Sequence, residues 1–174
     1  LIMKKKISVL INNKIKKFNK KISVESDKSI SHRALLIASQ CIGVSNINNI
    51  LESEDVKNTI ICLKKLRVKI IKIKKKYIVY GNGLGSFRQP KNNSLYAGNS
   101  GTLARLLIPL LGTHSNLKVT ISGDNSLNKR DMKRIIEPLS KIGCNFYPKE
   151  KNTLPLTIEG TEMPLALKHI EKIG

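Results

Sequence analysis

An internal repeat constrains the fold of this chain more than any other feature of its sequence. Leu63–Ile70 (LKKLRVKI) aligns with Leu139–Phe146 (LSKIGCNF), and Tyr77–Gly81 (YIVYG) resembles Pro155–Gly160 (PLTIEG). The offset is about 75 residues, and repetition on this scale is typical of folds that stack copies of one small unit. We therefore predict that one α/β unit occurs twice in the chain.

Hydrophobic periodicity and turn residues indicate a β-α-β-α-β-β order within each unit. Two stretches, 34–38 and 106–111, are apolar on all sides, which predicts that the first helix of each unit is buried. Residues 81–83 are expected to form a turn. The expected helices are 27–41, 55–66, 101–111 and 129–142, and the expected strands are 22–24, 44–50, 68–73, 77–80, 117–122, 144–147 and 156–159.

The formal net charge of +20 raises the question of a polyanionic partner. Lysine is spread over almost every segment and accompanies equally frequent isoleucine and asparagine, a composition that an AT-rich coding sequence produces in any protein. Aromatic residues make up only 4% of the chain, so side chains that would stack on single-stranded bases are scarce. We interpret most of the charge as solvated surface, and a basic nucleic-acid-binding protein of similar repeat fold stays open as the alternative.

The cysteines and histidines show no spacing typical of a metal site. Cys41, Cys62 and Cys144 are far apart and each lies in an apolar context, which predicts reduced, buried thiols and a cytoplasmic protein. No apolar run approaches the ~18 residues that a membrane-spanning helix needs, so we expect no membrane association.

The first cluster of polar residues lies where the first helix is expected to begin. Lys28, Ser29 and Arg33 place a cation, a hydroxyl and a guanidinium near the free backbone amides of a helix start, which suits a phosphate group. His32 lies beside them and is a further candidate for a ligand contact. Alternatively, Asp27 caps an ordinary helix and the charged residues are solvated.

Two later helix starts have a similar character. Gly98–Thr102 is a glycine-bracketed polar turn whose backbone can approach an anion closely, although a plain loop would look the same. Arg130 follows the polar turn 123–128 and is expected near the start of the 129–142 helix. The positive end of the helix dipole lies there and disfavours a cation. We therefore consider it a ligand contact or a surface residue. Asp55 is expected to cap the second helix.

Three motifs, taken in order, resemble the 5-enolpyruvylshikimate-3-phosphate synthase family: DKSISHRALL from Asp27, GNSGTLARLL from Gly98 and GDNSLNKRDMKRIIEPL from Gly123. The resemblance implies an inside-out α/β barrel of repeated β-α-β-α-β-β units, with helices inside and sheets outside, incomplete in this chain. It also implies a division of the chain: initial strands of the other, C-terminal domain at 1–20, and two of the three units of the first domain at about 21–90 and 91–174.

The same resemblance implies an enzyme of aromatic amino acid biosynthesis that belongs to the shikimate pathway and works in the cytoplasm. The family transfers the enolpyruvyl group of phosphoenolpyruvate to the 5-hydroxyl of shikimate 3-phosphate and releases phosphate. It implies no cofactor, no metal, no nucleic acid and no membrane, and a monomer when complete. The proton-transferring residues lie beyond Gly174 in the family, so we expect no catalytic residue within this chain and no turnover from it alone.

Site residues follow from the motifs one by one. The residues implied to hold shikimate 3-phosphate are Lys28, Ser29 and Arg33, and those implied to contact phosphoenolpyruvate are Lys28, Gly101 and Arg130. Asp55 and Asn99 match positions just behind these contacts. The small residue at Gly101 leaves room for phosphoenolpyruvate, which implies sensitivity of the complete enzyme to glyphosate.

The chain departs from the family pattern at two places. Glu25-Ser26 stands where Pro-Gly is usual, and Asp131 stands where a proline commonly follows the arginine of the third motif. The UDP-N-acetylglucosamine enolpyruvyl transferases share the fold but lack the Lys-Ser-x-Ser-x-Arg pattern that begins at Lys28. A non-catalytic remnant of the enzyme also stays open.

Overall fold

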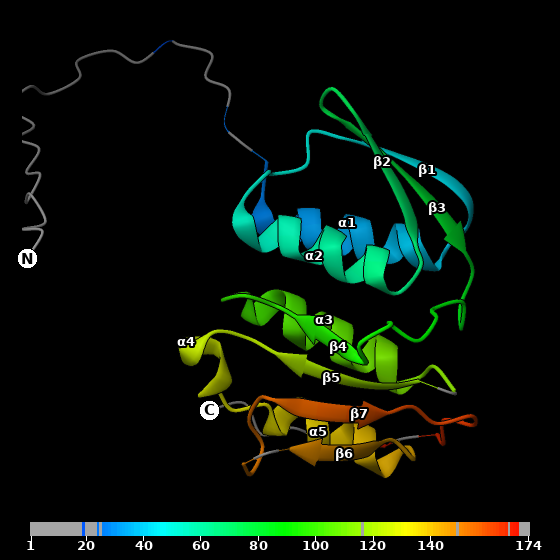
Figure 1. Cartoon of the computed structure of the whole chain (residues 1–174), viewed down its shortest axis with the longest axis vertical. Helices are drawn as coiled ribbons and strands as arrows, with labels where there is room; N and C mark the ends of the chain where they lie inside the picture. Colours follow the sequence, from blue (N-terminus) through cyan, green and yellow to red (C-terminus); the bar gives the residue numbers. More distant parts are fainter. Residues whose placement is uncertain are drawn as a thin grey trace, which may run out of the picture.

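A computed structural model describes most of the chain, and helices and strands in it form two adjoining layers of structure (Figure 1). The described residues are 19, 24, 26–115, 117–148, 150–166 and 168–170. The elements are α1 (Lys28–Gln40), β1 (Ile42–Asn48), α2 (Glu54–Lys65), β2 (Lys69–Ile73), β3 (Lys76–Asn82), β4 (Ser94–Tyr96), α3 (Gly101–Gly112), β5 (Lys118–Ser122), α4 (Asn125–Asn128), α5 (Lys133–Lys141), β6 (Asn145–Pro148) and β7 (Leu156–Glu159).

The first layer is an antiparallel sheet in the order β1-β3-β2, with α1 and α2 against it. Val44 of β1 pairs with Tyr80 of β3, and Ile71 of β2 pairs with Ile78 of β3. Tyr77 and Val79 on β3 point into the core, while their neighbours on the strand are partly exposed. This alternation is the period of two that a sheet with one covered face requires.

The second layer is a mixed sheet in the order β4-β5-β7-β6. β4 runs parallel to β5, whereas β5, β7 and β6 pair in antiparallel fashion. Helix α3 contacts β5 and β7, and α5 contacts α3 and β6. The buried side chains of the central strands, such as Val119, Ile121 and Ile158, face these helices across one apolar core.

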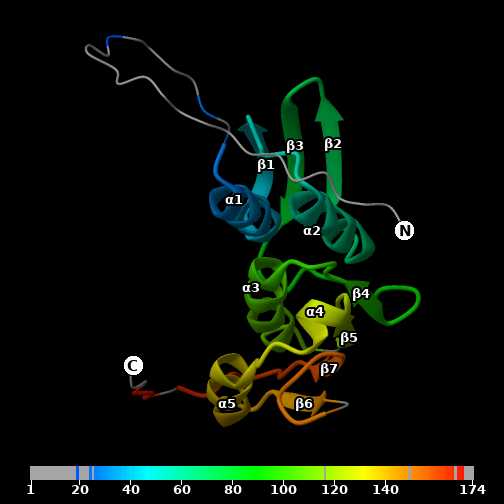
Figure 2. The same ribbon diagram turned by 90° about the vertical axis from the view of Figure 1, so that its left-hand side faces the viewer.

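Helices α1, α2 and α3 contact one another, and each sheet covers the helices of its own layer from one side, whereas α5 lies farther along, against α3 and β6 (Figures 1 and 2). This is the predicted arrangement of helices inside and sheets outside. Each fully buried leucine contributes about 1.5–3 kcal/mol relative to an exposed one. The leucines of α1, α2 and α3 and of the turn after α2 that are fully buried or nearly so are Leu35, Leu63, Leu66, Leu103, Leu107 and Leu111.

Most predicted elements occur within two residues of their expected bounds, but the helix expected at 129–142 begins four residues late, as α5. The short α4, which was not expected, precedes that segment, and the Asp124 carboxylate caps it by accepting a hydrogen bond from the Leu127 amide. The Asp131 carboxylate accepts a hydrogen bond from the Lys133 amide. A local bond of this kind competes with helix formation, which places the start of the expected helix after Asp131.

Three smaller expectations also fail, and strand β4 was not expected. Residues 81–82, which we expected in a turn, belong to β3, where Asn82 pairs with Ile42. Cys41 is exposed, whereas Cys62 and Cys144 are buried as predicted. Helix α1 is not covered on all sides, because Ile30 and Ile37 on one face are 67% and 63% exposed.

Some expectations lie outside the described residues. These are nearly all of the segment 1–20 and the strand expected at 22–24, of which the structure describes only Val24. The division of the chain into repeat units and domains therefore stays a prediction. Within the described part of the chain, no helix combines the length and apolarity needed to cross a membrane.

Candidate functional site

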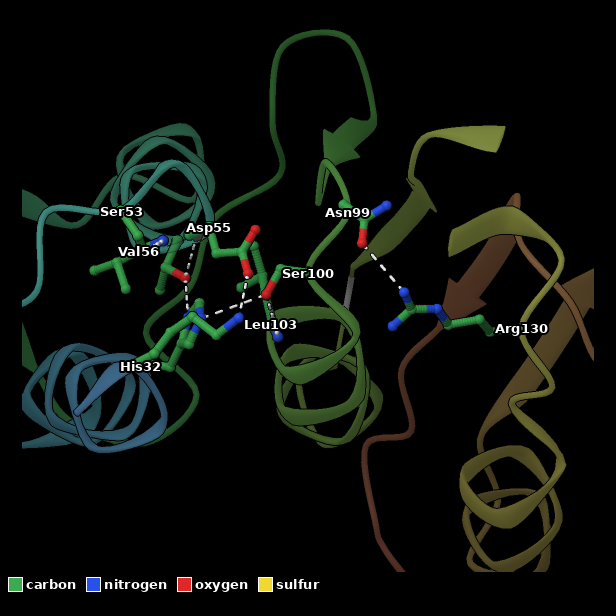
Figure 3. A network of polar contacts seen from close by, with 10 residues as sticks. His32, Ser53, Asp55, Val56, Asn99, Ser100, Leu103 and Arg130 are labelled. Atoms are coloured by element: carbon green, nitrogen blue, oxygen red, sulfur yellow. Dashed lines mark hydrogen bonds and ion pairs between the residues drawn. The ribbon is translucent and has the colours of Figure 1, made fainter. Parts of the chain in front are cut away.

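The first turns of α1, α2 and α3 lie side by side at one end of these three packed helices (Figures 1 and 3). Each is capped by a short polar residue just before it, respectively Asp27, Ser53 and Ser100, whose side chain accepts a hydrogen bond from an amide of the first turn. Such caps fix where a helix starts and leave further amides of its first turn facing outward. The sequence therefore places three positive helix ends next to one another.

Lys28 reaches from α1 to the first turn of α2. Its Nζ lies 2.9 Å from Oδ2 of Asp55, and the lysine side chain is half exposed while that of Asp55 is 22% exposed. Asp55 is therefore not the cap that we expected, since Ser53 has that role. The carboxylate instead holds the Lys28 ammonium at the junction of two helices. An exposed pair of this kind contributes about 0–1 kcal/mol to folding, so its main effect is on where the ammonium lies.

Ser29 and Arg33 face the solvent one turn apart on α1. The Nη1 atom of Arg33 donates to the Ser29 carbonyl oxygen at 3.1 Å and also to its Oγ. The hydroxyl and the guanidinium are thus adjacent, as the i, i+4 spacing predicted. Both are accessible to a ligand that approaches the start of α1.

His32 lies behind this surface and is fully buried. Its Nδ1 is 2.6 Å from Oγ1 of Thr59 on α2, and its Nε2 is 3.4 Å from Oγ of Ser100 at the start of α3. The pKa of His32 is lowered from its usual value by burial, with Lys28 and Arg33 acting in the same direction and Asp55 against it. The ring is a neutral link between helices, and its buried position does not support the ligand contact considered for it.

Gly101 begins α3 at a point where two guanidinium groups converge. A β-carbon at this position would lie 2.9 Å from Nη1 of Arg130 and 3.3 Å from Nη1 of Arg105. Glycine therefore lets the arginines approach the start of α3 without a side chain between them. Arg105, which the sequence reading did not select, also donates to the Asp131 carbonyl oxygen at 3.4 Å.

Arg130 is held against the same turn by a chain of polar contacts. Its Nη2 donates to Oδ1 of Asn99 at 3.1 Å (Figure 3). Nδ2 of Asn99 in turn donates to Oδ2 of Asp124 at 2.6 Å. The bond from Asn99 lowers the pKa of the Asp124 carboxyl, as do the Leu127 amide and the Arg130 charge. Asp124 is a second residue that sequence reasoning missed, although its position before a helical turn is typical of a cap.

The location expected for Arg130 needs correction. It does not lie in the first turn of a helix but follows the C-cap Lys129 of α4 and precedes α5. The argument from an unfavourable helix dipole therefore does not apply to it. The interpretation of Arg130 as a ligand contact rests instead on its proximity to Gly101 and Asn99.

The predicted residues thus form two adjacent groups. Lys28 and Asp55 meet at the starts of α1 and α2, and Asn99, Gly101 and Arg130 meet at the start of α3. The contact between His32 and Ser100 joins the two groups.

The combination of outward amides, an ammonium and guanidinium groups suits an anion with several charged oxygens. Among the described residues, no group of three or more histidine, cysteine, aspartate or glutamate side chains is placed to hold a metal ion. Asp131, one of the departures noted above, directs its carboxylate to the Lys133 amide at 2.7 Å. Glu25, the other acidic departure, lies outside the described residues.

Comparison with known proteins finds matches to one enzyme family. The sequence model of the family EPSP synthase (3-phosphoshikimate 1-carboxyvinyltransferase) matches residues 12–172. A 3-phosphoshikimate 1-carboxyvinyltransferase of Syntrophomonas wolfei is 41% identical over 154 residues, which cover 88% of this chain and 36% of that protein. The enzyme of the same name from Petrotoga mobilis is 42% identical over 154 residues, covering 86% and 35%.

The fold agrees as well. A solved structure of EPSP synthase from Acinetobacter baumannii matches with a TM-score of 0.80 at 31% identity, covering 86% of this chain and 34% of that one. The chain spans about a third of the length of the curated relatives that it matches. On the match over 12–172 and these identities, the chain belongs to the EPSP synthase (3-phosphoshikimate 1-carboxyvinyltransferase) family.

Proposed function

We propose that this chain is the part of a 3-phosphoshikimate 1-carboxyvinyltransferase that binds the two anionic substrates. In that reaction the 5-hydroxyl oxygen of shikimate 3-phosphate loses its proton and forms a bond to C2 of phosphoenolpyruvate, and the methylene carbon takes up a proton. The bond from C2 to the phosphate oxygen of the tetrahedral intermediate then breaks, the methyl group loses a proton, and inorganic phosphate leaves.

One observation carries the proposal: cationic side chains from separate segments meet at adjoining helix starts. The Lys28 ammonium lies at the junction of α1 and α2, and the Arg130 guanidinium lies over Gly101 at the start of α3. Both substrates carry several negative charges, and bringing them together requires concentrated positive charge that is already in place. Prepositioned cations of this kind cost little reorganisation when the ligands arrive.

We assign the contacts by helix. Shikimate 3-phosphate would bind Lys28, Ser29 and Arg33, all on the first two turns of α1. Phosphoenolpyruvate would bind Lys28, the Gly101 turn and Arg130, and so bridges α1 and α3. Asp55 and Asn99 would orient Lys28 and Arg130 through the contacts described above.

The chain by itself would bind without turning over, because the assignment contains no proton-transferring group. Residues 1–20 would begin the second domain of the enzyme, and 21–174 would form two of three units of the first. We further propose a monomeric cytoplasmic enzyme that needs neither a metal nor an organic cofactor.

A binding experiment with matched lysine variants tests the proposal. Lys28→Ala should weaken the binding of shikimate 3-phosphate, measured by titration calorimetry, by about tenfold or more, since a charge-assisted hydrogen bond contributes about 1.5–3 kcal/mol. Lys64→Ala removes an exposed lysine from the last turn of α2, away from the site, and should leave the affinity unchanged. Equal effects of the two substitutions would contradict the proposal.

One feature favours the rival function of binding nucleic acid. A surface cavity of about 270 Å³ is lined by Lys64, Lys65, Arg67 and Lys91, and the chain carries a formal charge of +20. A nucleic-acid-binding protein would bind RNA with an affinity that falls steeply with salt. We expect instead weak RNA binding that shikimate 3-phosphate does not displace.

A further inference from the structure

His32 is the point at which the three helices of the candidate site are joined. The histidine belongs to α1, its Nδ1 contacts Oγ1 of Thr59 on α2 at 2.6 Å, and its Nε2 contacts Oγ of Ser100 at the start of α3 at 3.4 Å. Ser100 is also buried and Thr59 is fully buried. The polar contact between α1 and α3 therefore lies in the interior, directly beneath the turns that carry Lys28 and Gly101.

The hydrogen bonds around His32 fit one neutral tautomer of the ring. The Thr59 hydroxyl donates to the Asp55 carbonyl oxygen at 3.4 Å, which leaves its oxygen able to accept an Nδ1–H of His32. Ser100 Oγ accepts the Leu103 amide at 3.2 Å, and its own hydrogen can then point at Nε2. Every buried polar atom in this chain of contacts has a partner, which is the condition for a well-ordered interior network.

The two substrates depend on this network to different degrees, an inference that rests on the proposed function. All the side chains assigned to shikimate 3-phosphate project from α1. The groups assigned to phosphoenolpyruvate are Lys28 on α1, the Gly101 turn at the start of α3, and Arg130, which comes from the segment between α4 and α5 and lies against Gly101. A change in the separation of α1 and α3 would thus disturb only the second site. We propose that His32 is a positioning residue that sets the start of α3 relative to α1, through Ser100, and thereby controls affinity for phosphoenolpyruvate.

The substitution His32→Asn isolates this link. The asparagine amide nitrogen can take the place of Nδ1 and keep the bond to Thr59, but the side chain is too short to reach Ser100. We expect the affinity for phosphoenolpyruvate, titrated at saturating shikimate 3-phosphate, to fall about threefold to tenfold, as for one lost neutral hydrogen bond. The affinity for shikimate 3-phosphate alone should change less than about twofold.

A second variant and a control keep the test decisive. Ser100→Gly removes the other partner while glycine still serves as a helix cap, and it should give the same selective loss if His32→Asn fails to fold. His114→Asn alters another buried histidine, which is 2% exposed and bonded to Leu110, and should change neither affinity.

The outcomes separate the two proposals. Selective weakening of phosphoenolpyruvate supports the positioning role. If the wild type binds both ligands and the variants lose affinity for both equally, or for neither, the positioning role is overturned and the proposed function is left intact. A wild-type protein that binds neither ligand overturns the proposed function and this inference with it.

Discussion

The Arg130 guanidinium lies against the backbone of Gly101, so close that a β-carbon there would be 2.9 Å from Nη1. Arg130 comes from the segment between α4 and α5, 29 positions further along the chain than the first residue of α3. Because Gly101 has no side chain, the charge of Arg130 can lie directly against the start of α3. This relationship leads to the first prediction.

Gly101→Ala should change binding more than stability. The methyl group would meet the ends of two flexible arginine side chains, which can move away, and alanine is a good helix former. We expect phosphoenolpyruvate affinity to fall about tenfold while the free energy of unfolding changes by less than about 1 kcal/mol. Titration calorimetry and urea denaturation measure the two quantities.

Gly160→Ala is the matched comparison for that substitution. A β-carbon at Gly160 would collide with the backbone carbonyl oxygens of His114 and Leu111, which cannot move independently of the fold. We expect a loss of about 1–3 kcal/mol in the free energy of unfolding. A Gly101→Ala protein as unstable as Gly160→Ala would contradict our description of the α3 start.

Arg130→Lys should separate the geometry of the guanidinium from its charge. A lysine keeps the positive charge but lacks the planar fork that can donate to Asn99 and to a ligand together. We expect phosphoenolpyruvate affinity to fall about tenfold and shikimate 3-phosphate affinity to change less than about twofold. Arg88→Lys, at an exposed arginine outside the site, should change neither. An Arg130→Lys protein with wild-type affinity for phosphoenolpyruvate would remove Arg130 from the site.

The three cysteines should react with a thiol reagent at very different rates. Cys41 is exposed, whereas Cys62 and Cys144 are buried, and burial raises the pKa of the Cys62 thiol to about 11 and also raises the pKa of Cys144. Since the thiolate is the reacting form, one thiol per chain should react quickly at neutral pH. The other two should react only at the rate of unfolding. Cys41→Ser should abolish the fast phase, and two or more fast thiols would contradict the packing of α2 and β6.

Acid should destabilise the protein through its buried histidines. Burial lowers the pKa of His114 below its ordinary value of 6.5, although a bond to the Leu110 carbonyl oxygen opposes the shift. The unfolded chain then binds a proton at His114 that the folded protein does not. The free energy of unfolding is therefore unaffected by this histidine above pH 6.5 and decreases as pH falls below that value. His32 acts in the same direction.

Urea denaturation between about pH 7.5 and pH 5.5 measures this effect, since few carboxylates titrate in that range. His114→Gln lacks the titrating ring and should lose less stability over the interval than the wild type. An identical pH dependence in the two proteins would exclude His114 as a cause.

The sequence predicted the parts of the fold that depend on local signals. The start of α1 followed from Asp27, whose side chain accepts the Ile30 amide as a cap should. Strand β4 was missed because three residues show no periodicity, and the strand exists only through its parallel pairing with β5. The helix expected at 129–142 begins only at Lys133, because the Asp131 carboxylate bonds to the Lys133 amide and Lys129 ends α4.

The residues of the candidate site could be selected from the sequence, but the contacts between them could not. Lys28, Gly101 and Arg130 were recognisable from motifs, and the structure brings Gly101 and Arg130 into contact. The partners of His32 lie 27 and 68 residues away in the chain. No local pattern distinguishes such a histidine from a surface residue, because its role arises only when three helices pack together.

Our proposal requires that separate helix starts form one anion-binding surface. Titration of the ¹⁵N-labelled protein with shikimate 3-phosphate, followed by amide chemical shifts, tests it most directly. We expect saturable shifts concentrated at 27–33 and at Asp55, followed by shifts at 98–101 when phosphoenolpyruvate is added to the saturated protein. Shifts confined to the basic cavity lined by Lys64, Lys65, Arg67 and Lys91, with none at the helix starts, would contradict it.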